Sequence, residues 1–227
     1  MVCLGIDTSG ETLSVGLCDG GKILGERTTQ GGNSHSVVIL PEIEALLKEA
    51  GVKGADVSLV SVTGGPGRYT ALRVGMATAK GLAYSWDVPL ARVSTLEALA
   101  VSLLPHRGPV VPVLDARRQL VYYAIFEAAG DSLKRLEDDQ AVPYAAAASS
   151  IPERSLLTGD GVSLVTLHLR EEGTPYATRD GAIRGGIVAK LGEATFMSRG
   201  TNEILEGPVY IRKVEIHGRG LHNNPNG

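Results

Sequence analysis

Carboxylate and hydroxyl side chains stand together where the first apolar segment of the sequence ends. Asp7, Thr8 and Ser9 follow a short apolar run. A carboxylate beside hydroxyl groups can hold a magnesium–phosphate complex. The same aspartate can instead accept hydrogen bonds within the turn at Gly10. We favour the turn, because a nucleotide site also needs a glycine-rich adenosine-binding segment later in the chain, and the Gly-Gly pair at 185–186 is too little for one.

A second candidate is the glycine- and proline-rich turn Gly65-Pro66-Gly67, which precedes an expected helix. Free backbone amides at a helix start attract anions, so this turn could cradle a phosphate. It lacks the lysine and the Gly-Lys-Ser/Thr ending of a P-loop, so nucleotide hydrolysis is not expected there. We favour a tight strand-to-helix turn whose glycines take conformations closed to other residues. An anion held at this joint when a partner closes over it stays the alternative, with these candidate contacts: Asp7, Gly65, Gly67 and Arg73.

Histidines and cysteines are few and are not spaced as metal ligands. Cys3 and Cys18 cannot form a Cys-x-x-Cys site, and we interpret them as a reduced structural pair that lies opposite across a hairpin. No Gly-x-Ser-x-Gly elbow is present, so a peptidase is not supported. We therefore expect no catalytic residue, no metal site and no cofactor. The histidines, none in ligand spacing, are His35, His106, His168, His217 and His222.

The bulk properties limit the partners that the chain can have. With 227 residues, 43% of them hydrophobic, it can bury one good core or two smaller ones. A net charge of −3 and a pI near 6.0 give no general attraction to polyphosphate, so binding of tRNA by this chain alone is not expected. No basic leader precedes the first apolar run, and no run is long enough to span a membrane. We expect a cytoplasmic protein.

The elements that position these residues form two similar series. The first begins with a three-strand meander, and a helix follows that can be capped by Asn33 or Ser34 and ends at Gly51. Pro41 should bend that helix, unless a new helix begins there. A strand, a helix, a strand and a helix capped by Ser94 complete the series. The expected elements are strands 2–7, 13–18, 22–28, 57–62 and 89–93, and helices 34–51, 70–84 and 94–104.

The second series repeats the same order with weaker signals. Three strands are expected at 110–114, 120–127 and 132–138, and then a helix after Pro143, a strand at 156–157, a helix after Gly161 and a helix at 183–198. This repetition predicts two α/β subdomains, residues 1–105 and 106–212. Residues 213–227 are rich in glycine and asparagine and are expected to form a flexible tail.

Seven segments in the same order along the chain resemble one family. Gly65-Pro66-Gly67-Arg68-Tyr69-Thr70-Ala71-Leu72-Arg73-Val74-Gly75 resembles the Gly-Pro-Gly-Ser-Phe-Thr-Gly-Leu-Arg-Ile-Gly signature of TsaB (YeaZ) proteins, with Arg68-Tyr69 in place of Ser-Phe and Ala71 in place of glycine. Six further segments match the same family in order along nearly the whole chain: Leu4 to Ser9, His35-Ser36 with Leu40-Pro41, Val93 to Leu96, Asp115 to Arg118, Gly159 to Gly161, and Pro208 to Arg212.

The resemblance implies a duplicated actin-like fold of the ASKHA, ribonuclease H-like type, with two mixed, five-stranded subdomains and flanking helices. It also implies a non-catalytic scaffold subunit of the bacterial complex that transfers threonylcarbamoyl to tRNA adenosine. The implied partners are the catalytic paralogue TsaD, the ATPase TsaE and, when alone, a second copy; tRNA would be contacted only indirectly. Thr95 and Leu99 stand where the paralogue carries two metal-binding histidines, and neither side chain can replace an imidazole. The alternatives are an independent actin-like ATPase or small-molecule kinase.

The expected helix 70–84 is apolar almost all round, so more than one side of it must be covered. Small residues at Ala71, Gly75 and Ala79 would let another helix approach closely. We expect this helix and the one before it to bind the paralogue, unless other elements of the chain cover both faces. The predicted partner-binding residues are Val37, Leu40, Ile43, Leu47, Leu72, Gly75, Met76, Ala79 and Leu82.

Overall fold

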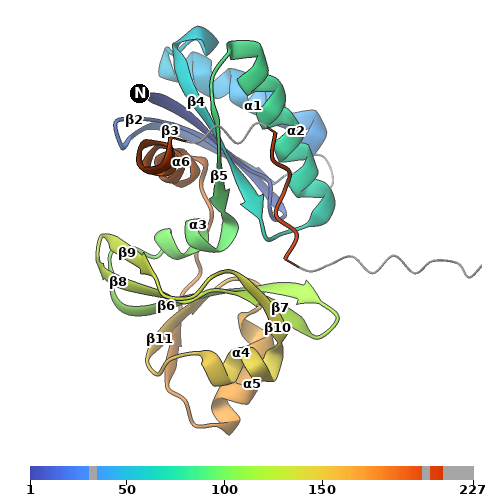
Figure 1. Ribbon diagram of the computed structural model, residues 1–227, viewed down its shortest axis with the longest axis vertical. Coiled ribbons are helices and arrows are strands. Elements are labelled where there is room, and N and C mark those ends of the chain that lie inside the picture. Colours follow the sequence, from blue (N-terminus) through green and yellow to red (C-terminus); the bar gives the residue numbers. More distant parts are fainter. Residues whose placement is uncertain (31–34, 201–204, 212–227) are drawn as a thin grey trace, which may run out of the picture.

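Two β-sheets with the same strand order stand one above the other in the computed structural model (Figure 1), which describes residues 1–30, 35–200 and 205–211. The N-terminal sheet has the order β3-β2-β1-β4-β5, in which the meander is antiparallel and β4 and β5 run parallel to β1. Cys3 pairs with Cys18 across β1 and β2, as the sequence predicted. The strands are β1 (Val2–Asp7), β2 (Thr12–Asp19), β3 (Lys22–Gln30), β4 (Val57–Gly65) and β5 (Leu90–Ser94).

Helices α1 (His35–Ala50) and α2 (Tyr69–Trp86) cover one face of this sheet. Alternate side chains of β1, including Leu4 and Ile6, point into the core that the two helices close. Pro41 lies inside α1, so a second helix does not begin there, and the predicted cap at Asn33 or Ser34 falls outside the described residues. The short η1 (Gly54–Asp56) joins α1 to β4.

Among the described residues, the C-terminal sheet has seven strands instead of the expected five. The path β10-β7-β6-β11-β12 repeats the topology of the first sheet, again three antiparallel strands followed by two parallel ones, and β8 and β9 pair outside this path. Helices α4 and α5 cover one face of it. Its elements are β6 (His106–Arg117), β7 (Leu120–Tyr123), β8 (Phe126–Gly130), β9 (Ser132–Arg135), β10 (Gln140–Pro143), α4 (Tyr144–Ser150), β11 (Ser155–Thr158), α5 (Val162–Glu171) and β12 (Tyr176–Thr178).

Two strand predictions for this half were wrong. The expected strand 120–127 is two strands, since β7 pairs with the end of β6 and β8 with its beginning. The expected third strand of the meander, at 132–138, is β9, which pairs only with β8. The third position belongs instead to β10, whose four residues carry too little apolar alternation to be recognised.

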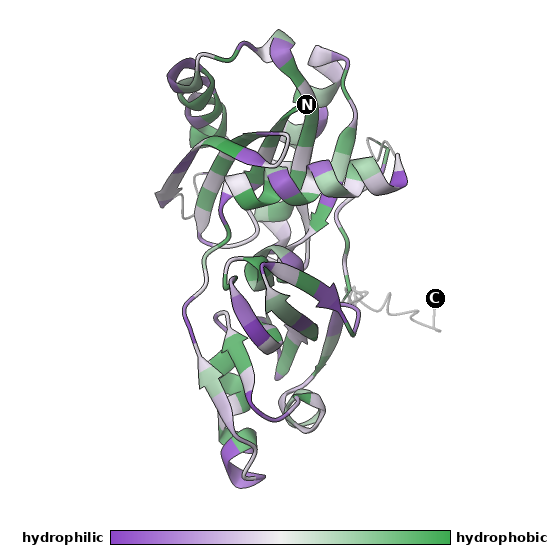
Figure 2. Cartoon of the chain, turned by 90° about the vertical axis from the view of Figure 1, so that its left-hand side faces the viewer, coloured by the Kyte–Doolittle hydropathy of each residue, from purple (hydrophilic) through white to green (hydrophobic). Residues whose placement is uncertain are grey.

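Each half ends in a helix that packs on the sheet of the other half. Helix α3 (Thr95–Val101) contributes Leu96 and Ala100 to a core with Val110 and Phe126 of the C-terminal sheet. Helix α6 (Gly185–Arg199) covers the second face of the N-terminal sheet, where it crosses in front of the strands in Figure 2. The predicted subdomain 106–212 included this helix, but the structure places it on the strands of the first half.

Glycines on both partners allow α6 to lie directly on the sheet. A Cβ atom on Gly5 would collide with the carbonyl oxygen of Gly185, and one on Gly16 would collide with the backbone of Gly186. Ser61 of β4 lies similarly close to Gly192 and donates a hydrogen bond of 2.9 Å from its hydroxyl to the carbonyl oxygen of Val188. The glycine pair at 185–186 therefore serves helix packing. No helix among the described residues is long and apolar enough to cross a membrane.

Candidate functional site

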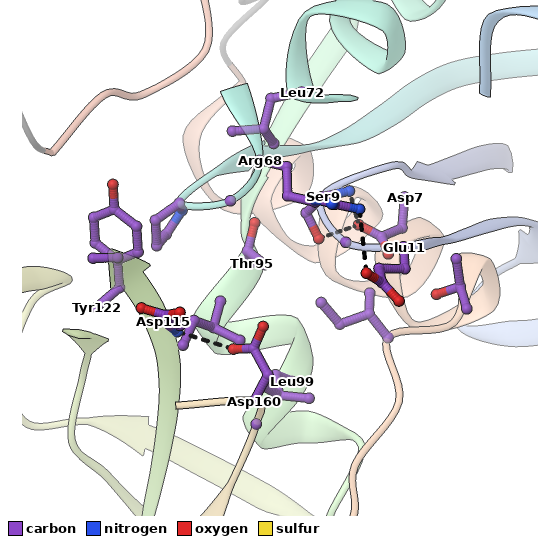
Figure 3. Close-up of a pocket in the computed structure, with 18 of the residues that line it drawn as sticks. Asp7, Ser9, Glu11, Arg68, Leu72, Thr95, Leu99, Asp115, Tyr122 and Asp160 are labelled. Atoms are coloured by element: carbon purple, nitrogen blue, oxygen red, sulfur yellow. Dashed lines mark hydrogen bonds and ion pairs between the residues drawn. The ribbon is translucent and has the colours of Figure 1, made fainter. Parts of the chain in front are cut away.

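A cavity of about 960 Å³ lies between the two sheets (Figure 3). Its walls come from the β1–β2 connection, the start of α2, helix α3, the ends of β6 and β11, and the segment at 205–211, which we call the C-terminal strap. Its volume falls at the upper end of the range typical of small-molecule sites. The cavity is therefore the candidate ligand-binding site of the chain.

Asp7 lines this cavity, but its carboxylate is occupied within the chain. Its Oδ1 atom accepts hydrogen bonds from the Ser9 amide at 3.1 Å, the Ser9 hydroxyl at 2.7 Å and the Thr63 hydroxyl at 2.7 Å. Burial raises the pKa of Asp7, although these hydrogen bonds oppose the shift. Asp7 therefore organises its own turn through Oδ1.

The Gly65-Pro66-Gly67 turn is also covered from within the chain. The amide of Arg68 donates to the carbonyl oxygen of Ser9 at 2.9 Å. The C-terminal strap lies against the turn, because the Val209 amide donates to the Gly64 carbonyl oxygen at 2.7 Å. A Cβ atom on Gly65 would stand only 2.7 Å from the Val209 oxygen. Of the four candidate anion contacts, only Asp7 and Gly67 line the cavity.

Arg73, the fourth of these candidates, is held by aromatic rings. Its guanidinium lies 4.1 Å from the centre of the Tyr69 ring and donates to the Tyr210 hydroxyl at 3.0 Å. The rings of Tyr69 and Tyr210 are themselves 5.1 Å apart. The hydrogen bond to Tyr210 raises the pKa of Arg73. This arginine therefore fastens the C-terminal strap to α2 instead of standing free to bind an anion.

Helix α3 presents Thr95 and Leu99 to the cavity. Thr95 is 1% exposed, and its Oγ1 atom has no hydrogen-bond partner among the described residues. Leu99 is buried and apolar. Within residues 1–30, 35–200 and 205–211, no cluster of three or more His, Cys, Asp or Glu side chains could hold a metal ion. Catalysis by a metal bound at α3 is therefore not supported by these side chains.

Asp115 and Asp160, which belong to segments that match the family, were not predicted as site residues. Both line the cavity, and the Asp115 amide donates to Oδ1 of Asp160 at 2.9 Å. They lie near the carboxyl ends of β6 and β11, which are parallel neighbours, and this is where α/β sheets commonly bind ligands. If the pairing of these strands had been known, that rule would have predicted that Asp115 and Asp160 lie close together in one site.

Most of the predicted partner-binding residues are covered by the chain itself. Ile43, Leu72, Gly75, Met76 and Ala79 are buried, because the N-terminal sheet and the neighbouring helix enclose them. These five residues therefore pack within the chain, and a role for them in partner binding stays a prediction. Helix α2 needs less cover from a partner protein than expected, because its small residues pack against strands and turns of the same chain.

Four of the predicted residues remain accessible. Val37 is 72% exposed and Leu40 is 54% exposed, while Leu47 and Leu82 are half-buried. On α2, Ala77, Gly81 and Tyr84 are exposed, and Tyr84 reaches 83%. The four accessible residues of the predicted set and these three residues of α2 together form a surface that we call the docking face: Val37, Leu40, Leu47, Ala77, Gly81, Leu82 and Tyr84.

Known proteins resemble this chain in sequence and in fold. The family model described as TsaD, tRNA N6-adenosine threonylcarbamoyltransferase, matches residues 23–161. A Bacillus subtilis (strain 168) protein named tRNA threonylcarbamoyladenosine biosynthesis protein TsaB is 37% identical over 145 residues, which are 64% of this chain and 63% of that protein. The Escherichia coli (strain K12) protein of the same name is 31% identical over 144 residues, 63% of this chain and 62% of that protein. The chain thus spans about three fifths of the length of the curated relatives it matches.

The structure of YeaZ from Pseudomonas aeruginosa superimposes with a TM-score of 0.79 and 24% identity, over 92% of this chain and 99% of that one. At this identity the superposition bears on the fold alone. Together with the mixed sheets and their flanking helices, it confirms the predicted α/β, actin-like class.

Proposed function

Because the chain belongs to the TsaB (YeaZ) family, we propose that it is a subunit of the machinery that makes threonylcarbamoyladenosine in tRNA. In this proposal it binds a TsaD-type catalytic paralogue and supports the transfer of threonylcarbamoyl to adenosine. A TsaE-type ATPase completes the complex, and tRNA is reached through the partners, in the cytoplasm. Without the paralogue the chain pairs with a second copy of itself.

The proposal assigns no reaction centre to this chain. Its main support is the cavity side of α3, where Thr95 and Leu99 take the positions of the two metal-binding histidines that the family resemblance gives to the paralogue. A hydroxyl and an isobutyl group cannot supply two imidazole ligands. The internal hydrogen bonds of Asp7 add to this, because they engage Oδ1 of its carboxylate in the turn.

The docking face supports the binding role. Large apolar side chains on a monomer are commonly exposed singly, but here Val37, Leu40 and Tyr84 belong to two neighbouring helices. The exposed Ala77 and Gly81 leave room for a helix of a partner to approach. The face is therefore suited to helix-on-helix association, with its centre displaced from the buried residues that the sequence suggested.

A double substitution, Val37→Glu with Leu40→Glu, tests the docking face. Two charges would have to be desolvated in the interface, so we expect co-elution with a TsaD-type protein to be lost and reconstituted transfer to fall at least about tenfold. Leu167→Glu on α5, where the leucine is 62% exposed, is the matched control and should leave both unchanged. Co-elution of the double variant at the wild-type level would show that the docking face is not the site of binding.

The same preparation distinguishes the alternative function. ATP turnover is measured with the chain alone, and transfer to tRNA is measured with and without it. We expect no turnover by the chain alone and transfer only when it is present. ATP hydrolysis or phosphorylation of a small molecule by the purified chain would favour the actin-like ATPase or kinase.

A further inference from the structure

The Gly159-Asp160-Gly161 turn and the end of β6 build one wall of the cavity and have no part in the proposed scaffold role. Gly159 has a φ of +107°, and Cβ atoms on Gly159 or Gly161 would collide with the backbone of β6. This close approach holds Asp160 beside Asp115, so that its Oδ1 atom accepts from the Asp115 amide. The Gly159-Asp160-Gly161 turn is therefore built to hold one carboxylate at a fixed place in the cavity wall.

A buried, unpartnered hydroxyl lies across from this turn. The Oγ1 atom of Thr95 has no hydrogen-bond partner among the described residues, although the side chain is almost completely buried. Figure 3 shows Thr95 on the same opening as Asp115 and Asp160, between that pair and the side of the opening formed by Ser9 and Arg68. Leaving a buried hydroxyl without a hydrogen bond is destabilising, so a ligand that hydrogen-bonds to Thr95 recovers that cost.

The charges around the cavity favour a cation over an anion. Its carboxylates are Asp7, Glu11, Asp115 and Asp160, against the two arginines Arg68 and Arg117. Both arginines are already paired, Arg68 with Glu11 at 3.6 Å and Arg117 with Asp115 at 3.0 Å. Among the carboxylates that line the cavity, Asp160 is the exposed one that forms no ion pair with an arginine in the described part of the chain. A polyphosphate would meet this surplus of negative charge, whereas a protonated amine would be attracted to it.

The remaining walls are apolar and aromatic. Leu99 and Leu114 lie on the side of the carboxylate pair, and Tyr122 stands beside Asp115 in Figure 3. An aromatic ring next to a carboxylate suits an organic cation, because the face of the ring also attracts positive charge. These walls offer contact to the hydrocarbon part of a ligand whose charged end lies at the carboxylates.

We propose that the cavity is a binding site for a small organic amine. Its ammonium group lies at Asp160, its apolar or aromatic body packs against Leu99, Leu114 and Tyr122, and a polar substituent reaches the hydroxyl of Thr95. This site does not depend on the proposed scaffold function, since it uses none of the docking face.

The full chain is titrated with phenethylamine by two-dimensional NMR, and the neutral isostere phenethyl alcohol serves as the matched probe. We expect the amine to shift resonances of the cavity residues with an affinity at least about tenfold higher than that of the alcohol, since one charge–charge contact separates them. Equal affinities for the two probes, or tighter binding of ADP in the same cavity, would overturn the proposal.

Two variants locate the site. Asp160→Asn keeps an oxygen that can accept from the Asp115 amide, so the fold should persist while affinity for the amine falls at least about fivefold. Asp131→Asn removes an exposed carboxylate at the β8–β9 turn and should change nothing. Thr95→Val removes only the unpartnered hydroxyl and should leave phenethylamine binding nearly unchanged, but should weaken tyramine at least about twofold if the hydroxyl of that amine reaches Thr95. Wild-type affinity in Asp160→Asn would refute an ammonium site at this turn.

Discussion

At the scale of single residues, Asp7 is the carboxylate whose environment differs most from water. It is 2% exposed, and Oδ1 receives all three of its described hydrogen bonds, from Ser9 and Thr63. These hydrogen bonds favour its charged form, and His35 adds a smaller contribution in the same direction. Burial outweighs these contacts and raises the pKa of Asp7 in the folded state, so the ionised carboxylate is less favourable there than in the unfolded chain.

This raised pKa predicts the sign of a pH effect. A raised folded pKa contributes stability that is complete below the unfolded pKa and is lost as pH rises through the folded pKa. Asp7→Asn keeps an oxygen at the Oδ1 position and cannot ionise. We expect its free energy of unfolding, minus that of the wild type, to increase with pH and then level off, as measured by urea unfolding between about pH 4 and pH 8.

Asp131→Asn, at an exposed position, is the control for that measurement and should give a difference that stays close to constant. A difference for Asp7→Asn that falls with rising pH would contradict the assignment.

The residues proposed to hold an anion were harder to judge from the sequence, because the sequence does not show that the C-terminal strap brings Tyr210 to Arg73 and Val209 to Gly65. Those contacts join segments more than 130 residues apart in the chain.

At the scale of elements, the packing of α6 on the N-terminal sheet depends on the absence of side chains at the contact. Gly16→Ala places a methyl group against the backbone of Gly185 and Gly186, and neither backbone can retreat without lifting the helix. We expect the free energy of unfolding to fall by about 3 kcal/mol, as in strongly overpacked cores. Denaturant unfolding monitored by circular dichroism measures it.

Gly10→Ala is the comparison, because a Cβ atom there meets nothing within 4 Å. It should change the stability by no more than about 0.5 kcal/mol. If Gly16→Ala were equally mild, α6 would have to be held by its other contacts. Foremost among these is Glu193, whose carboxylate accepts from the amides of Gly20 and Gly21 at 3.2 and 2.8 Å.

The elements themselves could largely be predicted from periodicity and turn residues. The N-terminal meander, the helix with Pro41 and the Ser94 cap, whose hydroxyl accepts from the Glu97 amide at 3.2 Å, all follow from local signals. The wrong predictions concern features that the local sequence does not determine. Strands of three or four residues such as β10 and β12 carry no readable alternation, and which face of α2 is buried depends on its neighbours.

At the scale of the whole molecule, the two halves exchange their last helices. Helix α3 closes a core of the C-terminal sheet, and α6 closes the second face of the N-terminal sheet, where Cys3, Cys18, Leu59 and Ala91 are buried with Ala189. The sequence repeat located the halves near residue 105, but it could not show this exchange, because the periodicity of a helix is the same whichever sheet it covers.

This exchange predicts how fragments behave. Residues 1–105 alone leave the α6 side of the sheet open, so we expect no cooperative thermal unfolding from that fragment. The same fragment joined by a flexible linker to residues 183–200 should unfold cooperatively. A version of the joined fragment with Gly185→Leu, whose side chain would collide with the backbone of Val15 and Gly16, is the control and should behave like 1–105 alone. Cooperative unfolding of 1–105 by itself would show that α6 is dispensable.

The exchanged helix also sets the order of events on the ribosome. Strand β5 is complete at Ser94, but the helix that shields its sheet ends at Arg199, about a hundred residues later. Since synthesis proceeds at roughly 5–20 residues per second, one apolar face of the nascent sheet stays exposed for on the order of 5–20 s. During that interval a chaperone, or aggregation with another nascent chain, competes with the chain's own carboxyl-terminal third for the same surface.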